Sequence, residues 1–550
     1  MMTVDCRPLI GCHILLACLL LCGCASVTKA ESPVLAPVTE IANGALRGQS
    51  DGVIATYKGI PYAAPPIGPL RWSAPAPFAS WNGTRDATAF GAACTQPQVP
   101  AASLYNDPPA RTSEDCLNLN VWAPVSAENA PVIVWIHGGS LRIGGSGLGM
   151  YDGMKFAQRG VVFISLNYLG ALGWMAHAEL SGQSQEGVSG NYGLLDQIAA
   201  LRWVQKNVAG FGGNPENITI MGESAGALSV TYLMASPAAR GLFDKAIIQS
   251  PNSRPFPELS QSRFGLPSAE ATGARLVEAL NIGNIQEART LDAQKITDVA
   301  TARGFVPQGT IDGKILPRQI VDVFDQGEQA KVPVLVGFNS GEVRSQRIFL
   351  PPIPATEAAY ADAIESGYGK LSAEYLLNYP ATDMEGSMLS ALRDGIYGWA
   401  AERIAKRQAD AGIPSYLYVF DHCYPAAAAR DLCAFHASEL PFVFGNLNDA
   451  ILPEHWPVPD GRSDAVIASA MLDYWTSFAR DGMPRSDGSP NWLPYADGKA
   501  FMRFANSAEL ARDPYGGAFE LNEAFVSQRR AAGRSWGLQV GVAAGGQSTN

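Results

Sequence analysis

The pentapeptide GESAG at residues 222–226 is the part of this sequence with the clearest chemical meaning. It follows the apolar run 218–221 and opens a run of small and apolar residues, 225–234, that is compatible with a helix. A serine between two glycines at a strand-to-helix turn is typical of a nucleophile elbow, whose strained backbone lifts the hydroxyl above the sheet. We therefore predict Ser224 as a nucleophile, which requires a general base, an acid and donors for an oxyanion.

The base is expected among the histidines that follow Ser224. Where a serine occupies such a turn, an acidic residue comes next along the chain and the histidine comes last. His422, His436 and His455 meet that condition. His422 directly follows the apolar run 416–420, and the pattern alone favours it or leaves it level with His436.

The acid is expected in a loop that follows a strand. Glu342 lies just after the apolar run 332–338, where a carboxylate could hold the tautomer of the imidazole and stabilise its charged form. Asp312 is the main rival.

The oxyanion donors are expected at a second strand end. Gly138 and Gly139 follow the apolar run 132–136, so their N–H groups can approach a tetrahedral oxyanion without an intervening side chain. Together with the N–H of Ala225 they would form a hole with three donors.

Composition favours one large folded domain. The 550 residues are 47% hydrophobic and 17% charged, which suits a single extensive core. The net charge of -11 argues against a nucleic-acid partner. The sequence shows no metal-ligand cluster and no phosphate-binding loop in a suitable setting, so we expect neither metal nor cofactor, and a small-molecule substrate.

Apolar, β-branched runs alternate with helical patterns along the chain, as at 132–136, 161–166 and 218–221. Continuous apolar strands between helices indicate a mainly parallel sheet covered on both faces, the doubly wound α/β class. Helical patterns dominate residues 260–409, which predicts a helical insertion over the C-terminal ends of the strands, where substrates bind in such sheets.

The N-terminus resembles an export signal. The apolar run 14–21 is too short to span a bilayer and ends in Cys22-Gly23-Cys24, a pattern typical of bacterial lipoprotein cleavage. We predict a signal peptide at 1–23, lipidation of Cys24, a linker at 24–38 and one catalytic domain at 39–550. Cleavage after Ala30 is the alternative. In either case we expect an exported protein: lipidation of Cys24 would anchor it to the outer membrane by the lipid alone, whereas cleavage after Ala30 would leave it free in the periplasm or secreted.

Four cysteines remain after that segment, and an oxidising compartment permits them to pair. The pairs that are local in sequence are Cys94 with Cys116 and Cys423 with Cys433. Spacing alone does not fix the connectivity, because four cysteines allow three pairings.

Several longer motifs carry a family resemblance: EDCLNLNVW at 114–122, GNYGLLDQ at 190–197, FGGNP at 211–215 and YWTSFA at 474–479. With the elbow, they make the chain resemble the type-B carboxylesterases, which include bacterial carboxylesterases, para-nitrobenzyl esterases and cholinesterases. The resemblance implies the α/β-hydrolase fold, in which helices cover both faces of a large, mostly parallel sheet.

The resemblance also selects the triad. GFNSGE at 337–342 corresponds to the acid loop of the family, which implies Glu342 rather than Asp312. HASELPFVFG at 436–445 corresponds to its histidine segment, which implies His436 as the base. Two departures stand out, because Ser140 occupies the place of a usual third glycine and Val343 with Arg344 follow the acid instead of a small residue.

The resemblance implies structural features as well. Cys94 and Cys116 match the first disulfide of the family, and Arg71 and Glu114 resemble its structural ion pair. The pair Cys423 and Cys433 lies outside the usual pattern and is predicted from spacing.

These features together predict a serine esterase that acts on a medium-sized ester through an acyl-enzyme. One hypothesis about its substrate is a tricarballylic ester like those that fumonisin-type esterases of this family hydrolyse. Arginines near the chemistry could clamp its carboxylates; the candidates are Arg142, Arg254, Arg344 and Arg347. The alternative of another class is a non-catalytic, cholinesterase-like binding protein, although such relatives lack a complete triad.

Overall fold

The computed structural model describes residues 36–545. The predicted signal peptide, the lipidation site Cys24 and most of the predicted linker lie outside the described residues. Within residues 36–545, no helix is both long and apolar enough to cross a membrane.

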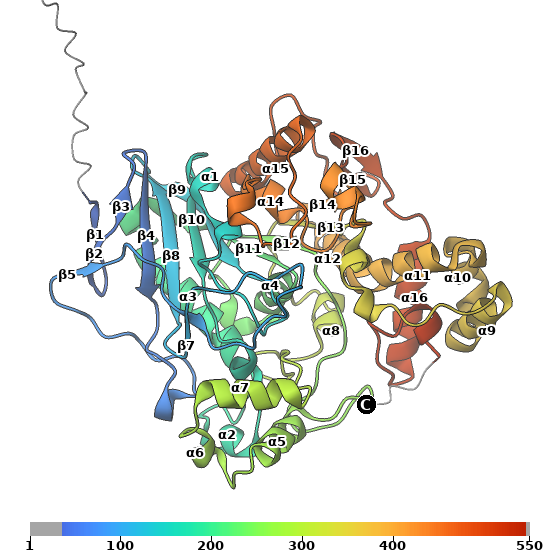
Figure 1. Cartoon of the computed structure of the whole chain (residues 1–550), viewed down its shortest axis with the longest axis horizontal. Coiled ribbons are helices and arrows are strands. Elements are labelled where there is room, and N and C mark those ends of the chain that lie inside the picture. Colours follow the sequence, from blue (N-terminus) through green and yellow to red (C-terminus); the bar gives the residue numbers. More distant parts are fainter. Residues whose placement is uncertain (1–35, 546–550) are drawn as a thin grey trace, which may run out of the picture. The chain divides into compact units, whose positions relative to one another are not determined.

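A mixed sheet of 11 strands forms the centre of this part of the chain (Figure 1). In spatial order the strands are β16 (Ala508–Arg512), β15 (Ala500–Phe504), β14 (Ser415–Phe420), β13 (Val334–Asn339), β12 (Lys245–Gln249), β11 (Gly213–Glu223), β9 (Ala130–Ile136), β10 (Val162–Leu166), β8 (Asn118–Pro124), β4 (Ile54–Pro61) and β3 (Gln49–Ser50). The strands from β10 to β15 run parallel, whereas β16 at one edge and β8, β4 and β3 at the other are antiparallel.

Both faces of the sheet are covered, as the continuous apolar strands predict. In β9, Val132, Val134 and Ile136 belong to one buried cluster, whereas Ile133 and Trp135 belong to the cluster on the opposite face. One face packs against α3 (Tyr192–Asn207), α4 (Ala225–Ala235) and α12 (Trp399–Asp410), and the other against α1 (Met154–Ala157) and α15 (Arg462–Asp481). The fold is therefore α/β, in agreement with the prediction.

The expected helical insertion is present as two groups of helices separated by β13. Between β12 and β13 lie α5 (Ala269–Ala279), α6 (Ile285–Ala288), α7 (Ala293–Ala302) and α8 (Ile320–Asp325). Between β13 and β14 lie α9 (Glu357–Tyr368), α10 (Ser372–Asn378), α11 (Met384–Arg393) and α12. Figure 1 shows α5, α6 and α7 gathered below the sheet, and α9, α10 and α11 gathered at the right.

Smaller elements complete the structure. Two further sheets consist of β1 (Val38–Ile41), β2 (Gly44–Arg47) and β5 (Thr84–Asp86), and of β6 (Ala93–Cys94) and β7 (Thr112–Ser113). The remaining α-helices are α2 (Ala178–Gln183), α13 (Pro425–Ala428), α14 (Leu440–Phe444) and α16 (Ala518–Ala531).

Candidate active site

The turn between β11 and α4 places Ser224 at the carboxyl end of the sheet. Ser224 has φ 55° and ψ -118°, a strained conformation for a residue with a side chain. Gly226 permits the turn because a Cβ at that position would lie 2.0 Å from the carbonyl oxygen of Ile136. The hydroxyl of Ser224 faces a cavity and is not covered by the sheet.

Two further side chains meet Ser224 in a continuous line of contacts. Nε2 of His436 lies 2.8 Å from Oγ of Ser224, and Nδ1 lies 2.5 Å from Oε2 of Glu342. The other carboxylate oxygen of Glu342 accepts the N–H of Asn339 at 2.9 Å. These contacts join residues that are 94 and 212 positions apart in the sequence. They can meet because β11 and β13 are near neighbours in the sheet and residue 436 follows β14.

The rival candidates have structural partners elsewhere. His422, which the pattern placed level with His436, is buried and its Nε2 lies 2.6 Å from Asp464 at the start of α15. Asp312 accepts a hydrogen bond from Asn191 and three from backbone N–H groups of the turn that follows it. Neither His422 nor Asp312 lines the cavity at Ser224.

The two glycines after β9 lie beside the nucleophile. A Cβ on Gly138 would lie 3.3 Å from Cβ of Ser224, so only glycine brings the backbone so close. Gly139 has φ 102°, which also favours glycine. Among the described hydrogen bonds, none uses the N–H of Gly138, Gly139 or Ala225, which leaves three donors available at the turn.

Tyrosines that the sequence did not single out hold these loops. The hydroxyl of Tyr168 donates to the carbonyl of His137 at 2.9 Å, and the two rings stack at 4.7 Å. The hydroxyl of Tyr105 lies 2.7 Å from Oγ of Ser345 and donates to the carbonyl of His436 at 3.0 Å. Tyr105 therefore links the histidine to the helical turn η6 (Glu342–Ser345) that carries the acid.

Two more buried carboxylates surround the imidazole. Oε1 of Glu223 lies 3.3 Å from Nε2 of His436, and Glu439 accepts hydrogen bonds from Gln249 at 3.0 Å and Asn339 at 2.6 Å. Burial raises the pKa of Glu223 to about 8. Both acids lie inside segments that the sequence had already singled out, but spacing gave no reason to assign them a role.

The charge balance of the site favours a protonated imidazole. Burial lowers the pKa of His436, but Glu342, and then Glu223 and Glu439, outweigh burial and raise this pKa to about 9. Glu342, the foremost of these groups, can stabilise the imidazolium that forms when a base takes a proton from a serine.

The cavity in front of Ser224 has a volume of about 950 Å³. Its walls combine aromatic side chains with a few acids, and its lining includes Tyr105, Tyr151, Trp456, Asp107 and Asp298. No lysine or arginine of residues 36–545 is among the lining residues. One wall is formed by α7, which confirms that the helical insertion reaches the substrate end of the sheet.

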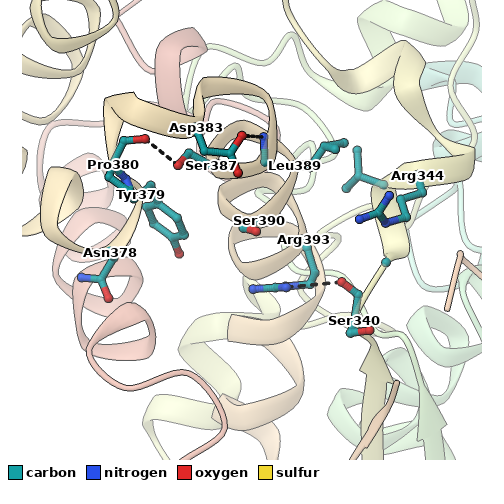
Figure 2. Close-up of a pocket in the computed structure, with 13 residues that line it drawn as sticks. Ser340, Arg344, Asn378, Tyr379, Pro380, Asp383, Ser387, Leu389, Ser390 and Arg393 are labelled. Atoms are coloured by element: carbon teal, nitrogen blue, oxygen red, sulfur yellow. Dashed lines mark hydrogen bonds between the residues drawn. The ribbon is translucent and has the colours of Figure 1, made fainter. Parts of the chain in front are cut away.

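The arginines that the sequence analysis proposed as substrate ligands are not among the residues that line this cavity. Arg344 pairs with Asp431 and lines a second cavity of about 400 Å³, together with Arg393 (Figure 2). Arg347 pairs with Asp431 and with Glu385.

The other two arginines also lie outside the catalytic cavity. Arg254 stands over the ring of Phe256 at 5.9 Å. Arg142 follows a tight turn in which its N–H donates to Gly139, and its side chain is not part of the cavity wall. The neighbour of Arg254 is thus a ring only two residues further along the chain.

The structure contains both cysteine pairs. Cys94 is bonded to Cys116 with an S–S distance of 2.06 Å, and Cys423 is bonded to Cys433. The Arg71–Glu114 ion pair is bidentate, at 2.7 and 2.6 Å.

Comparisons with known proteins agree with this geometry. The model of the carboxylesterase family matches residues 35–517. The fumonisin B1 esterase of Sphingopyxis macrogoltabida is 36% identical over 496 residues, 87% of this chain and 88% of that protein. The para-nitrobenzyl esterase of Bacillus subtilis is 34% identical and covers 82% of this chain and 91% of its own length.

Solved structures show the same relationship. A PNB esterase structure superposes with a TM-score of 0.76 at 31% identity, covering 88% of this chain and 99% of its own. A carboxylesterase from Geobacillus stearothermophilus gives a TM-score of 0.73 at 31% identity, with coverages of 88% and 99%. With an α/β-hydrolase fold and a family match across most of its length, the chain belongs to the carboxylesterase family, the enzymes that hydrolyse carboxylic esters.

Proposed function

We propose that this enzyme hydrolyses a medium-sized ester by two-step acyl transfer, with Ser224 as nucleophile, His436 as general base and Glu342 as the acid that orients the imidazole. The unbroken line of contacts from Ser224 Oγ through both ring nitrogens of His436 to Glu342 carries this proposal.

In the first step Oγ of Ser224 attacks the carbonyl carbon of the ester while its proton passes to Nε2 of His436. The C–O bond of the ester then breaks, and the alcohol leaves with that proton. In the second step water attacks the acyl-enzyme and gives a proton to the same nitrogen. The bond between the acyl carbon and Oγ then breaks, Oγ takes that proton back from Nε2, and the carboxylic acid leaves.

The oxyanion formed in each step is stabilised by the N–H groups of Gly138, Gly139 and Ala225. Their freedom from other acceptors and their position beside Ser224 support this role. Donors fixed before the reaction stabilise the transition state without reorganisation, so such a hole contributes strongly to rate.

A covalent probe tests the assignment. An organophosphonate should label Ser224 in the wild type, and Ser224→Ala should abolish both labelling and hydrolysis. Ser250→Ala is a matched control, because Ser250 is a buried serine that directly follows the neighbouring strand β12 and does not line the cavity. Absence of labelling at Ser224 would refute the mechanism and favour a binding protein.

The size and character of the cavity support a medium-sized, largely neutral substrate. A volume of about 950 Å³ lies near the upper end of the range for small-molecule sites. The similarity to a fumonisin B1 esterase supports a tricarballylic ester as the second candidate, whereas the absence of arginine and lysine among the lining residues argues against a polyanion. Comparing kcat/KM for a tricarballyl ester with kcat/KM for a butyrate ester of the same alcohol decides between them.

We also propose that the chain is exported and anchored through lipid on Cys24. The two disulfides, Cys94–Cys116 and Cys423–Cys433, support an oxidising compartment. Mass spectrometry of the mature N-terminus tests this proposal: a lipidated Cys24 supports it, a free N-terminus after Ala30 refutes the lipid anchor, and an uncleaved N-terminus refutes export.

A further inference from the structure

The disulfide between Cys423 and Cys433 lies in the segment that carries the catalytic histidine. Cys423 follows the end of β14 by three residues, and Cys433 precedes His436 by three. The bond closes a sequence separation of 10 residues. It therefore ties the chain next to the base back to the end of a central strand.

Cys423 is a fixed point on the sheet side of this bond. Two residues before it, the N–H of Asp421 donates to the carbonyl of Phe504 in β15 at 2.7 Å. Directly after it, Tyr424 is buried and its hydroxyl donates to the carbonyl of Pro457 at 2.8 Å. Because its neighbours on both sides are held by distant segments, Cys423 can fix the position of the cysteine bonded to it.

The backbone around Cys433 and His436 is strained. Asp431, Ala434 and Ala437 have φ of 53°, 46° and 69°, in the left-handed region that residues with a side chain rarely adopt. Such conformations persist only where the surrounding structure imposes them. The segment that presents the base therefore depends on outside restraints, and the release of one restraint lets its backbone relax.

The ion pairs near Cys433 are weak substitutes for a covalent restraint. Asp431 pairs with Arg344 and Arg347, but its side chain is 62% exposed. Ion pairs that face water contribute little, because solvent and salt screen them. These pairs cannot hold the strained segment as firmly as the disulfide does.

Cys433 also contacts the loop that carries the acid. A Cβ on Gly341 would lie 2.0 Å from the carbonyl oxygen of Cys433, so the two backbones touch there. The N–H of Gly341 donates to the carbonyl of Ala434 at 3.0 Å. Gly341 directly precedes Glu342, whose Oε2 lies 2.5 Å from Nδ1 of His436. A displacement of Cys433 would therefore disturb both members of the acid–base pair.

The bond is accessible from solvent in the folded protein. Cys423 is exposed and Cys433 is partly exposed, whereas Cys94 and Cys116 are 6% and 0% exposed. Thiol–disulfide exchange requires that the attacking thiolate reach one of the sulfurs. Mild reduction of the folded enzyme should therefore open Cys423–Cys433 and leave Cys94–Cys116 closed.

We propose that the Cys423–Cys433 disulfide is a positioning element of the triad, which holds His436 in line between Ser224 and Glu342, and that its reduction slows turnover without unfolding the enzyme. This inference rests on the proposed function, because it concerns the base of the same site. In the reduction a dithiol gives up two electrons and two protons and becomes a cyclic disulfide, while the S–S bond breaks and both cysteines become thiols.

The first test is reduction of the folded wild type with dithiothreitol, followed by kcat and KM for p-nitrophenyl butyrate. We expect kcat to fall about 10–100-fold, since a displacement of about 1 Å in a catalytic group can cost about 10²-fold. KM should change little, because most of the cavity wall belongs to other segments. Reoxidation should restore kcat. Alkylation with iodoacetamide and peptide mapping should find the new thiols at Cys423 and Cys433.

The second test is the double variant Cys423→Ser with Cys433→Ser, which should show the same loss of kcat and no further response to dithiothreitol. Its matched control is Ala428→Ser with Ala429→Ser, which adds two hydroxyls at exposed positions of the same segment and keeps the bond. The control should retain wild-type kcat and remain sensitive to the reductant. Near-UV circular dichroism should show that each protein is folded.

The outcomes separate this inference from the proposed function. An oxidised wild type that hydrolyses no ester refutes the proposed function. If the oxidised enzyme is active, wild-type kcat after opening of Cys423–Cys433 overturns the inference, and this holds even where the double variant does not fold. An equal loss in the alanine control, a loss confined to KM, a loss accompanied by unfolding, or alkylation of Cys94 and Cys116 in its place also overturns it.

Discussion

Replacing Glu342 by glutamine removes one negative charge beside His436 and preserves almost all of the side-chain volume. The carboxylate is fully buried, lies 2.5 Å from Nδ1 of His436 and accepts the N–H of Asn339. A glutamine oxygen can still accept from Asn339, so the loop should keep its shape. The imidazolium, however, loses the neighbour that stabilises it most.

The size of the effect follows from the electrostatics of the histidine. Burial lowers the pKa of His436, but Glu342 and the other carboxylates raise it from 6.5 to about 9, and at about 1.4 kcal/mol for each tenfold change this is on the order of 3 kcal/mol. Losing most of that stabilisation in the transition state slows acylation roughly 100-fold. If the tautomer is lost as well, the decrease approaches about 10⁴-fold.

The assay is kcat/KM for a soluble ester as a function of pH. His436 must be neutral to accept a proton, so activity rises as the pH passes its pKa. Because Glu342→Gln lowers that pKa, the rising limb of the profile should move to lower pH while the maximum falls. Asp464→Asn is the control, since it changes the other buried histidine–carboxylate pair, at His422, and should leave the limb in place. A Glu342→Gln enzyme that keeps more than about a tenth of wild-type kcat/KM, or an unmoved limb, would refute the reasoning.

Three further changes test the support of the site. Gly138→Ala should lower kcat about 10²–10³-fold with little change in KM, because it crowds one oxyanion donor, and steady-state kinetics measures this. Arg71→Ala leaves the carboxylate of Glu114, only 15% exposed, without its partner and should cost about 3–5 kcal/mol in denaturant unfolding. Replacing Cys94 and Cys116 together by alanine opens a loop closed over 22 residues and should cost about 3 kcal/mol in the same assay.

Each of these three predictions has a control or an outcome that would contradict it. Arg485→Ala breaks an exposed pair with Asp481 and should cost less than about 1 kcal/mol; an equal loss for Arg71→Ala would contradict its structural role. Wild-type kcat in Gly138→Ala would remove that glycine from the oxyanion hole. Unchanged unfolding after loss of the Cys94–Cys116 bond would show that the loop is held by its other contacts.

The elbow could be predicted from sequence because its signal is entirely local. A strand, a turn that needs glycines and a helix follow one another within about 20 residues, and each has its own pattern. The buried parallel strands were predictable for the same reason, since β9 and β11 are continuous apolar runs. The family resemblance extended this prediction to Glu342 and His436.

The hydrogen-bond or ionic partner of a loop residue often comes from a segment that is distant in the sequence. His422 and His436 both follow β14, yet only α15, about 40 residues further on, brings Asp464 to His422. Arg344 and Arg347 similarly take partners from other segments, since both pair with Asp431 and Arg347 also pairs with Glu385. Local sequence patterns therefore identify residues that are capable of catalysis, but they do not determine which groups those side chains contact.

The spacing of the triad along the polypeptide makes catalysis a late reporter of folding. Its members follow three strands, and β12 separates β11 from β13 in the sheet. A chain that has collapsed but has not yet added β14 would already contain the elbow and still be inert. During refolding, the return of ester turnover therefore marks the moment at which the last of these strands takes its register.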